Sequence, residues 1–208
     1  MADTRIMLAS GTLFDLANPE GSELSLYDIA FGLGRVCCFA GHTGRFYSVA
    51  EHCCHVARLV PVKQARAALL HDASEAIIGD VTRPLKAMLS EYRAIEERLE
   101  HAIADRFLGD DTEGKMFAYY RMHTPEIKAA DRAMCAVEAR ELMPHAAGYW
   151  EGIGADPADV ERARRIRLQC DKPEFATMQW LRAWHWYGHA EEEAAVQAQD
   201  VQPQAVAA

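Results

Sequence analysis

The stretch ALLHDASEAIIGDVTRPLK, residues 68–86, begins as an apolar helix and then places ionisable side chains among apolar ones. The first four ionisable residues of this stretch are His71, Asp72, Glu75 and Asp80. In a helix, residues three or four apart share a face, so His71 and Glu75 project together, and Asp72 is rotated by only about 100° from His71. Burying unpaired charge is costly, whereas an imidazole and a carboxylate are both ligands for a divalent metal. The pattern therefore predicts a metal site on a buried helix.

The remaining sequence is typical of one helical domain. The chain has 208 residues, half of them hydrophobic, which is enough for a single domain with a sizeable core. The predicted helices cover about residues 25–36, 48–60, 63–78, 90–107, 125–143, 156–170 and 173–188. Residues 5–24 are expected to form an extended arm or a short hairpin. We therefore expect an all-α fold with a single domain over residues 1–189 and a disordered tail over residues 190–208, which contains few large apolar side chains.

Several helix boundaries carry local signals. Ser25 precedes one apolar periodic segment, with Asp28 three residues on, and Ser48 precedes another, with Glu51 three residues on. A serine followed at this spacing by an acidic residue is typical of a helix start. Gly79 is expected to end the helix that contains the stretch above.

Composition excludes several classes of function. The formal net charge of −9 opposes sequence-independent binding to a nucleic acid polymer, which needs a basic surface. No apolar run approaches the roughly 18 residues of a membrane span, and the N-terminus resembles no secretory leader. The six cysteines show no C-x-x-C spacing and are expected to be reduced, packed thiols. We therefore expect a cytoplasmic protein with neither a membrane nor a nucleic acid polymer as partner.

Two other predicted helices each offer one more metal ligand. His52 lies in SVAEHCCHVA and Asp131 in EIKAADRAMCAVEARELM, each with apolar neighbours. A lone histidine or aspartate on a helix is more often a structural or solvated group. The order His, His-Asp, Asp along the chain favours instead a metal site shared between three helices.

Other patterns carry weaker signals. His42 and His55 are candidates for binding a second metal ion or donating to phosphate. The aromatic residues Trp180, Trp184 and Tyr187 recur at helical spacing, which favours a role in the core or at a subunit interface.

The ligand order and its flanking motifs resemble the HD-domain metal-dependent phosphohydrolases. FYSVAEHC and LLHDASEAIIGDVTRPLK are similar to the branch that contains bacterial 5′-deoxynucleotidases and phage deoxynucleoside triphosphohydrolases, including those specific for dATP. The resemblance covers about residues 25–140 and implies a compact helical bundle. It implies that His52, His71, Asp72 and Asp131 bind one divalent transition metal, which could be cobalt, manganese, zinc, nickel or iron. A second divalent ion could accompany a triphosphate substrate.

The same resemblance implies two catalytic residues and a set of substrate contacts. Glu75 would orient the attacking water or protonate the leaving oxygen, and Asp80 would position the substrate or the leaving 5′-oxygen. Relatives carry an arginine before the loop aromatic, whereas this chain has Cys38 followed by Phe39. Arg35 or Arg45 could therefore replace that arginine, and the Phe39 ring could stack on a base or sugar. His42 and Lys86 are candidates to bind phosphate, and Arg83 could share this role with Lys86.

We expect a metal-dependent phosphohydrolase of 2′-deoxynucleoside 5′-phosphates, in which activated water attacks the α-phosphorus. The FYSVAEH segment and the GHT loop favour a dNTP triphosphohydrolase of the dATP type, and a 5′-deoxynucleotidase acting on dNMPs is the alternative. A helical module that binds metal or nucleotide without turnover is a further alternative, because the loop arginine is missing. The resemblance also implies a homo-oligomer, either a dimer or a hexamer.

Overall fold

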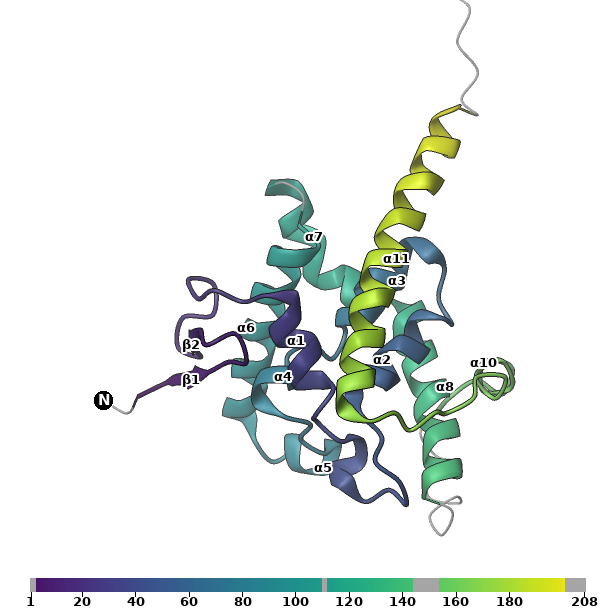
Figure 1. The fold of residues 1–208 in the computed structure, drawn as a ribbon, viewed down its shortest axis with the longest axis horizontal. Helices are drawn as coiled ribbons and strands as arrows, with labels where there is room; N and C mark the ends of the chain where they lie inside the picture. Colours follow the sequence, from purple (N-terminus) through teal and green to yellow (C-terminus); the bar gives the residue numbers. More distant parts are fainter. Residues whose placement is uncertain (1–2, 110–111, 144–153, 201–208) are drawn as a thin grey trace, which may run out of the picture.

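Helices make up most of the structure, which confirms the predicted all-α class (Figure 1). The computed structural model describes residues 3–109, 112–143 and 154–200. Its helices are α1 (Leu26–Leu33), α2 (Val49–Ala57), α3 (Val62–Leu70), α4 (Glu75–Ile78), α5 (Arg83–Lys86), α6 (Ser90–Phe107), α7 (Thr112–Met122), α8 (Pro125–Leu142), α10 (Pro157–Ala163) and α11 (Pro173–Asp200), with one 3-10 helix, η1 (Cys38–Gly41). No described helix has both the length and the apolar character that crossing a bilayer would require.

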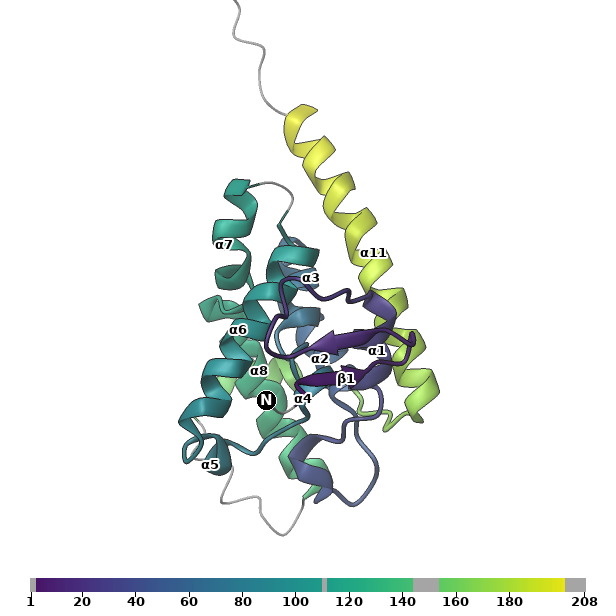
Figure 2. The same cartoon turned by 90° about the vertical axis from the view of Figure 1, so that its left-hand side faces the viewer.

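The N-terminal arm is a short hairpin, one of the two forms predicted for it. Strands β1 (Arg5–Met7) and β2 (Leu13–Asp15) are antiparallel, with Ile6 opposite Phe14. Phe14 is buried, and the backbone N–H of Ser10 donates to Asp28 Oδ1 at 2.8 Å. This hydrogen bond links the hairpin to the start of α1, and the hairpin lies beside that helix (Figure 2).

The predicted helix caps are present. The Ser25 hydroxyl accepts a bond from the backbone N–H of Asp28 at 3.1 Å, and the Asp28 carboxylate accepts one from the N–H of Ser25 at 3.2 Å. At the start of α2, the Ser48 hydroxyl accepts from the N–H of Glu51 at 3.2 Å. Glu51 does not complete a capping box there, because its carboxylate bonds to the segment before α11. The caps therefore fix where α1 and α2 begin.

The core forms where α2 packs against α3, α8 and α11. Trp180 on α11 has no exposed surface, and its indole N–H donates to the carbonyl of Leu69 at 3.1 Å. Trp184 stacks on Trp180 with ring centroids 5.8 Å apart, and Tyr187 is also buried. The aromatic stripe on α11 is thus part of the core, the first of the two roles predicted for it.

The structure differs from the predicted helix at residues 63–78. α3 ends at Leu70, four turn residues follow, and α4 begins at Glu75. The N–H of Ala73 bonds to the carbonyl of Leu70 at 2.9 Å and the N–H of Glu75 to that of Asp72 at 3.0 Å, so the chain tightens into turns of the 3-10 type. Gly79 ends α4 with a φ of +78°, as its identity predicted.

The C-terminal boundaries also differ. α10 is shorter than expected, and α7, which has little amphipathic character, was not predicted. α11 continues to Asp200 and runs past the rest of the molecule (Figures 1 and 2), so residues 190–200 of the predicted tail are helical. Alanine, glutamate and glutamine dominate this segment and have high helix propensity, which lets the helix extend beyond its packed part. Residues 201–208 lie outside the described residues.

Candidate metal centre

Three segments bring the predicted metal ligands together. His52 comes from the middle of α2, His71 and Asp72 from the turn between α3 and α4, and Asp131 from α8. Asp72 Oδ2 lies 3.1 Å from His71 Nε2 and 3.7 Å from His52 Nε2, and Asp131 Oδ1 lies 3.4 Å from His52 Nε2. Ligand atoms of His52, His71 and Asp72 all lie within 4.8 Å of one another. Asp131 therefore faces the same corner as the other three.

The turn after α3 explains the orientation of His71. His71 is the C-terminal cap of α3, and its Nδ1 lies 2.8 Å from the carbonyl oxygen of Ala68. A carbonyl can only accept, so Nδ1 carries the proton and the lone pair of the neutral ring is on Nε2. This Nε2 is buried and has no hydrogen-bond partner among the described residues, although Asp72 is close. A buried lone pair beside a carboxylate oxygen is an arrangement that a cation would stabilise.

The donor atoms at this centre fit a divalent transition metal. Two imidazole nitrogens and two carboxylates are a ligand set for zinc, cobalt, nickel, manganese or iron. Burial opposes protonation of His52 and His71, but the neighbouring groups together outweigh it, chiefly Glu138 and Asp131 at His52 and Asp72 at His71, and raise the pKa of each ring well above its usual value. The centre thus has an excess of negative charge that attracts protons or a metal ion.

Glu75 and Asp80 adjoin the four candidate ligands. Glu75 opens α4 and is buried, and burial raises its pKa well above the usual range, with the charges of Asp72 and Asp80 adding to this effect. Burial also raises the pKa of Asp80, again with a contribution from Asp72. Lys86 Nζ lies 3.6 Å from Glu75 Oε1 and bonds to Glu96 Oε1 at 2.6 Å. The site therefore contains a carboxyl group that keeps its proton to unusually high pH.

The other predicted substrate-binding residues lie in different surroundings. The Arg35 guanidinium bonds to Glu174 at 3.2 Å and to the carbonyl of Phe31 at 3.2 Å, so it is held against α11. His42 and Arg45 are exposed, and no contact joins them to the four ligands in the described part of the chain. Phe39 is half-buried against the core. Arg35 is therefore engaged with α11, and among the described residues neither His42 nor Arg45 forms a hydrogen bond or ion pair with a candidate ligand.

Cys38 lies beside the carboxylates of the centre. Burial raises the pKa of its thiol well above the usual value, and the charges of Glu138 and Glu75 add to this. The position that carries an arginine in the resembled family is therefore close to the centre, and no cation is supplied from it in this chain.

A buried group behind His52 was not predicted from the sequence. Glu138 Oε1 lies 2.8 Å from His52 Nδ1 and accepts a bond from the Tyr47 hydroxyl at 2.7 Å. The same hydroxyl lies 3.0 Å from His55 Nδ1. Burial, with the charges of His52 and Arg58, lowers the pKa of His55 to about 3, so this residue is a neutral member of the network, with its Nδ1 facing the Tyr47 hydroxyl. Glu138 follows Asp131 by two helical turns on α8, and this spacing was the available signal.

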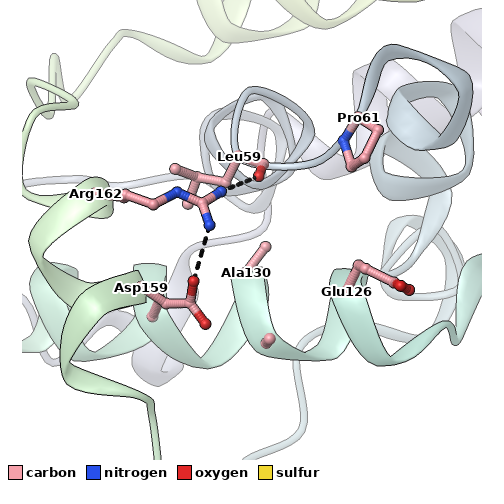
Figure 3. Close-up of a pocket in the computed structure, with 8 residues that line it drawn as sticks. Leu59, Pro61, Glu126, Ala130, Asp159 and Arg162 are labelled. Carbon is pink, nitrogen blue, oxygen red and sulfur yellow. Dashed lines mark hydrogen bonds and ion pairs between the residues drawn. The ribbon is translucent and has the colours of Figure 1, made fainter.

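A separate pocket of about 300 Å³ lies between α8, α10 and the segment that joins α2 to α3 (Figure 3). At one end, Arg162 bonds to Asp159 at 2.9 Å and to the carbonyl of Leu59 at 2.6 Å. The residues that line the pocket are Leu59, Pro61, Glu126, Ala129, Ala130, Ala133, Asp159 and Arg162. None of them is a candidate ligand, so this pocket is distinct from the metal centre.

Comparison with known proteins identifies two relatives of similar length. No family model matches the sequence. The chain is 35% identical over 149 residues to the uncharacterized protein YfdR of Escherichia coli (strain K12), which covers 72% of this chain and 78% of the relative. It is 32% identical over 173 residues to the uncharacterized protein RCAP_rcc00048 of Rhodobacter capsulatus, which covers 78% of this chain and 85% of the relative. At this identity and coverage, the chain belongs to the protein family that includes YfdR and RCAP_rcc00048.

Proposed function

We propose that this protein is a metal-dependent phosphohydrolase of the HD-domain type that acts on 2′-deoxynucleoside 5′-phosphates. The observation that carries the proposal is the convergence of His52, His71, Asp72 and Asp131, with the buried His71 Nε2 left without a hydrogen bond among the described residues. Bound at this centre, a divalent cation supplies Lewis-acid chemistry, which favours ionisation of a water molecule and offsets charge on a phosphate group.

Glu75 is suited to act as the general acid. Its raised pKa lets the carboxyl group hold a proton to higher pH than an ordinary glutamate does, and Lys86 Nζ lies 3.6 Å from one of its oxygens. When water attacks the α-phosphorus and the bond from phosphorus to the 5′-oxygen breaks, Glu75 donates its proton to that oxygen. Asp80, which follows the glycine that ends α4, would position the departing deoxyribose.

Arg83 is the best candidate for the phosphate-binding cation. A substrate phosphate would be repelled by Asp72 and Asp80 unless cations offset them. Arg83 opens α5 one turn before Lys86 and is exposed, and its guanidinium forms no hydrogen bond or ion pair with the described residues.

The position of Arg83 is supported by its effect on α8. Burial raises the pKa of Cys135 on α8 to about 12, and the charge of Arg83 acts against that shift. Arg83 on α5 is therefore close enough to α8 to interact with it, whereas Arg35 is bound to Glu174. We infer that Arg83, with Lys86, replaces the missing loop arginine.

A substrate panel tests the proposed activity. Protein freed of metal with EDTA is reloaded separately with Co²⁺, Mn²⁺, Zn²⁺, Ni²⁺ or Fe²⁺ and incubated with each dNTP and dNMP, and the phosphorus products are identified by ³¹P NMR. We expect tripolyphosphate and a deoxynucleoside from at least one dNTP. Inorganic phosphate from a dNMP alone would support the 5′-deoxynucleotidase instead.

Two variants make the panel specific to the site. Glu75→Gln removes the proton donor and should abolish product release, whereas Glu100→Gln, a matched change on α6, should not affect it. Glu100 contacts His123 and none of the candidate ligands in the described residues. Metal binding without product from any substrate would favour the non-catalytic module and contradict the phosphohydrolase.

A further inference from the structure

We propose that Glu138 is a positioning residue that holds His52 in the tautomer able to bind a cation, and that Tyr47 supports it. The inference rests on the proposed metal centre, but it assigns a role to residues that are not ligands themselves. Glu138 and Tyr47 are 1% and 0% exposed, so neither can exchange its partners for water.

The hydrogen bonds around Glu138 have only one consistent direction. Its two oxygens lie 2.8 and 3.1 Å from His52 Nδ1, and a carboxylate can only accept, so Nδ1 carries the proton. The single O–H of Tyr47 donates to Glu138 at 2.7 Å. The Tyr47 oxygen therefore accepts from His55 Nδ1, 3.0 Å away, which makes His55 the donor at the far end of the network.

This arrangement leaves the lone pair of His52 on Nε2, the atom that faces Asp131 at 3.4 Å and Asp72 at 3.7 Å. His71 reaches the same state differently, because its Nδ1 donates to the backbone carbonyl of Ala68. Both rings thus present Nε2 to one point. A carboxylate partner also increases the basicity of the ring it orients, which a neutral carbonyl does less strongly.

If Glu138 had only a structural role, we would expect its carboxylate to accept hydrogen bonds from backbone N–H groups. Glu51 on α2 is a buried carboxylate with such a role: it accepts three backbone N–H bonds, from Gln169 at 2.7 Å, Cys170 at 3.0 Å and Asp171 at 2.8 Å. The Glu138 carboxylate instead bonds to His52 and Tyr47, both through their side chains. Glu51 is consequently the matched control for Glu138.

The experiment compares Glu138→Gln and Glu51→Gln in the full chain, with Zn²⁺ alone as the probe. The amide introduced by Glu138→Gln has no charge and one acceptor oxygen in place of two, so it holds the proton on His52 Nδ1 less strongly and makes the ring a weaker ligand. We expect the Kd for Zn²⁺ to weaken by about 10–100-fold in Glu138→Gln. Glu51→Gln should lower stability and leave this Kd unchanged.

A spectroscopic signal separates positioning from loss of structure. In the Zn²⁺-loaded wild type, the His52 Nδ1–H bonded to a carboxylate should give a downfield ¹H resonance, identified by ¹⁵N correlation. That resonance should shift or disappear in Glu138→Gln and persist in Glu51→Gln. An unchanged resonance and an unchanged Kd in folded Glu138→Gln would overturn the proposal.

Two further outcomes keep the test decisive. If Glu138→Gln does not fold, Tyr47→Phe removes one donor to the same carboxylate, and an unmoved His52 resonance with unweakened Zn²⁺ binding in that variant would overturn the proposal. If the wild type itself does not bind Zn²⁺, Co²⁺ or Mn²⁺, the metal centre of the proposed function fails. Binding by the wild type with no effect of Glu138 leaves the proposed function intact and removes only the positioning role.

Discussion

Lowering the pH should destabilise the fold through His55, a residue that no candidate ligand contacts directly among the described residues. His55 is 4% exposed, and its Nδ1–H donates to the Tyr47 oxygen. Burial, with the charges of His52 and Arg58, lowers its pKa from 6.5 to about 3. Below pH 6.5 the unfolded chain therefore takes up a proton that the folded chain does not, and stability is lost as the pH falls toward 3.

The size of this effect follows from the two pKa values. Each pH unit in the window between about 3 and 6.5 corresponds to about 1.4 kcal/mol. Between pH 7 and pH 5, His55 alone should therefore lower the free energy of unfolding by about 2 kcal/mol. For a chain of this size, such a change is a substantial part of the total stability of roughly 5–15 kcal/mol.

The assay is urea unfolding of metal-free protein at pH 7 and pH 5, followed by circular dichroism. The variant is His55→Asn, because an asparagine amide can still donate to Tyr47 but does not titrate. The wild type should lose about 2 kcal/mol more than His55→Asn between the two pH values. The control is His189→Asn, a histidine on α11 whose side chain is 80% exposed and should contribute little. Equal pH dependence in the wild type and His55→Asn would refute the assignment of a buried neutral imidazole.

Three more predictions concern the metal centre. Zn²⁺ at about 100 times its Kd should stabilise the fold by about 2.7 kcal/mol and raise Tm by about 5–10 °C in a thermal melt, with no rise in His71→Ala. Asp72→Ala should lose bound metal in elemental analysis, whereas Glu75→Ala should keep the metal and lose product release; metal retained by Asp72→Ala would contradict its role as a ligand. Arg83→Gln should raise KM for the substrate more than it lowers kcat in steady-state assays, and an unchanged KM would exclude a phosphate contact.

Local signals predicted much of the fold. The serine caps and the period of apolar residues are sufficient to define α1, α2 and α6, because each depends on contacts within a few positions of the chain. The break between α3 and α4 was not predicted, since the residues around Ala73 have no helix breaker. The turn there places His71 and Asp72 at the end of a helix and not within one.

The candidate site was predictable only in part, for a related reason. His52, His71, Asp72 and Asp131 could be proposed because their residue types and order resemble a known pattern. Glu138 could not, since its partner His52 lies 86 positions away and the pairing exists only in the folded chain. The hydrogen bond between Arg35 and Glu174, 139 positions away, could not be predicted for the same reason.

The difference between Glu51 and the aspartates at the centre bears on why charge is buried there. Three backbone donors from the chain itself offset the burial of Glu51. Asp72 and Asp131 face the Nε2 atoms of His52 and His71, whose Nδ1 protons are already used elsewhere. A neutral imidazole therefore offers these aspartates only a lone pair, and the contact is favourable only when a proton or a metal ion lies between them. The fold thus stabilises the buried Glu51 carboxylate internally and leaves the two half-buried aspartates dependent on a cation, which is the physical basis for the proposed metal centre.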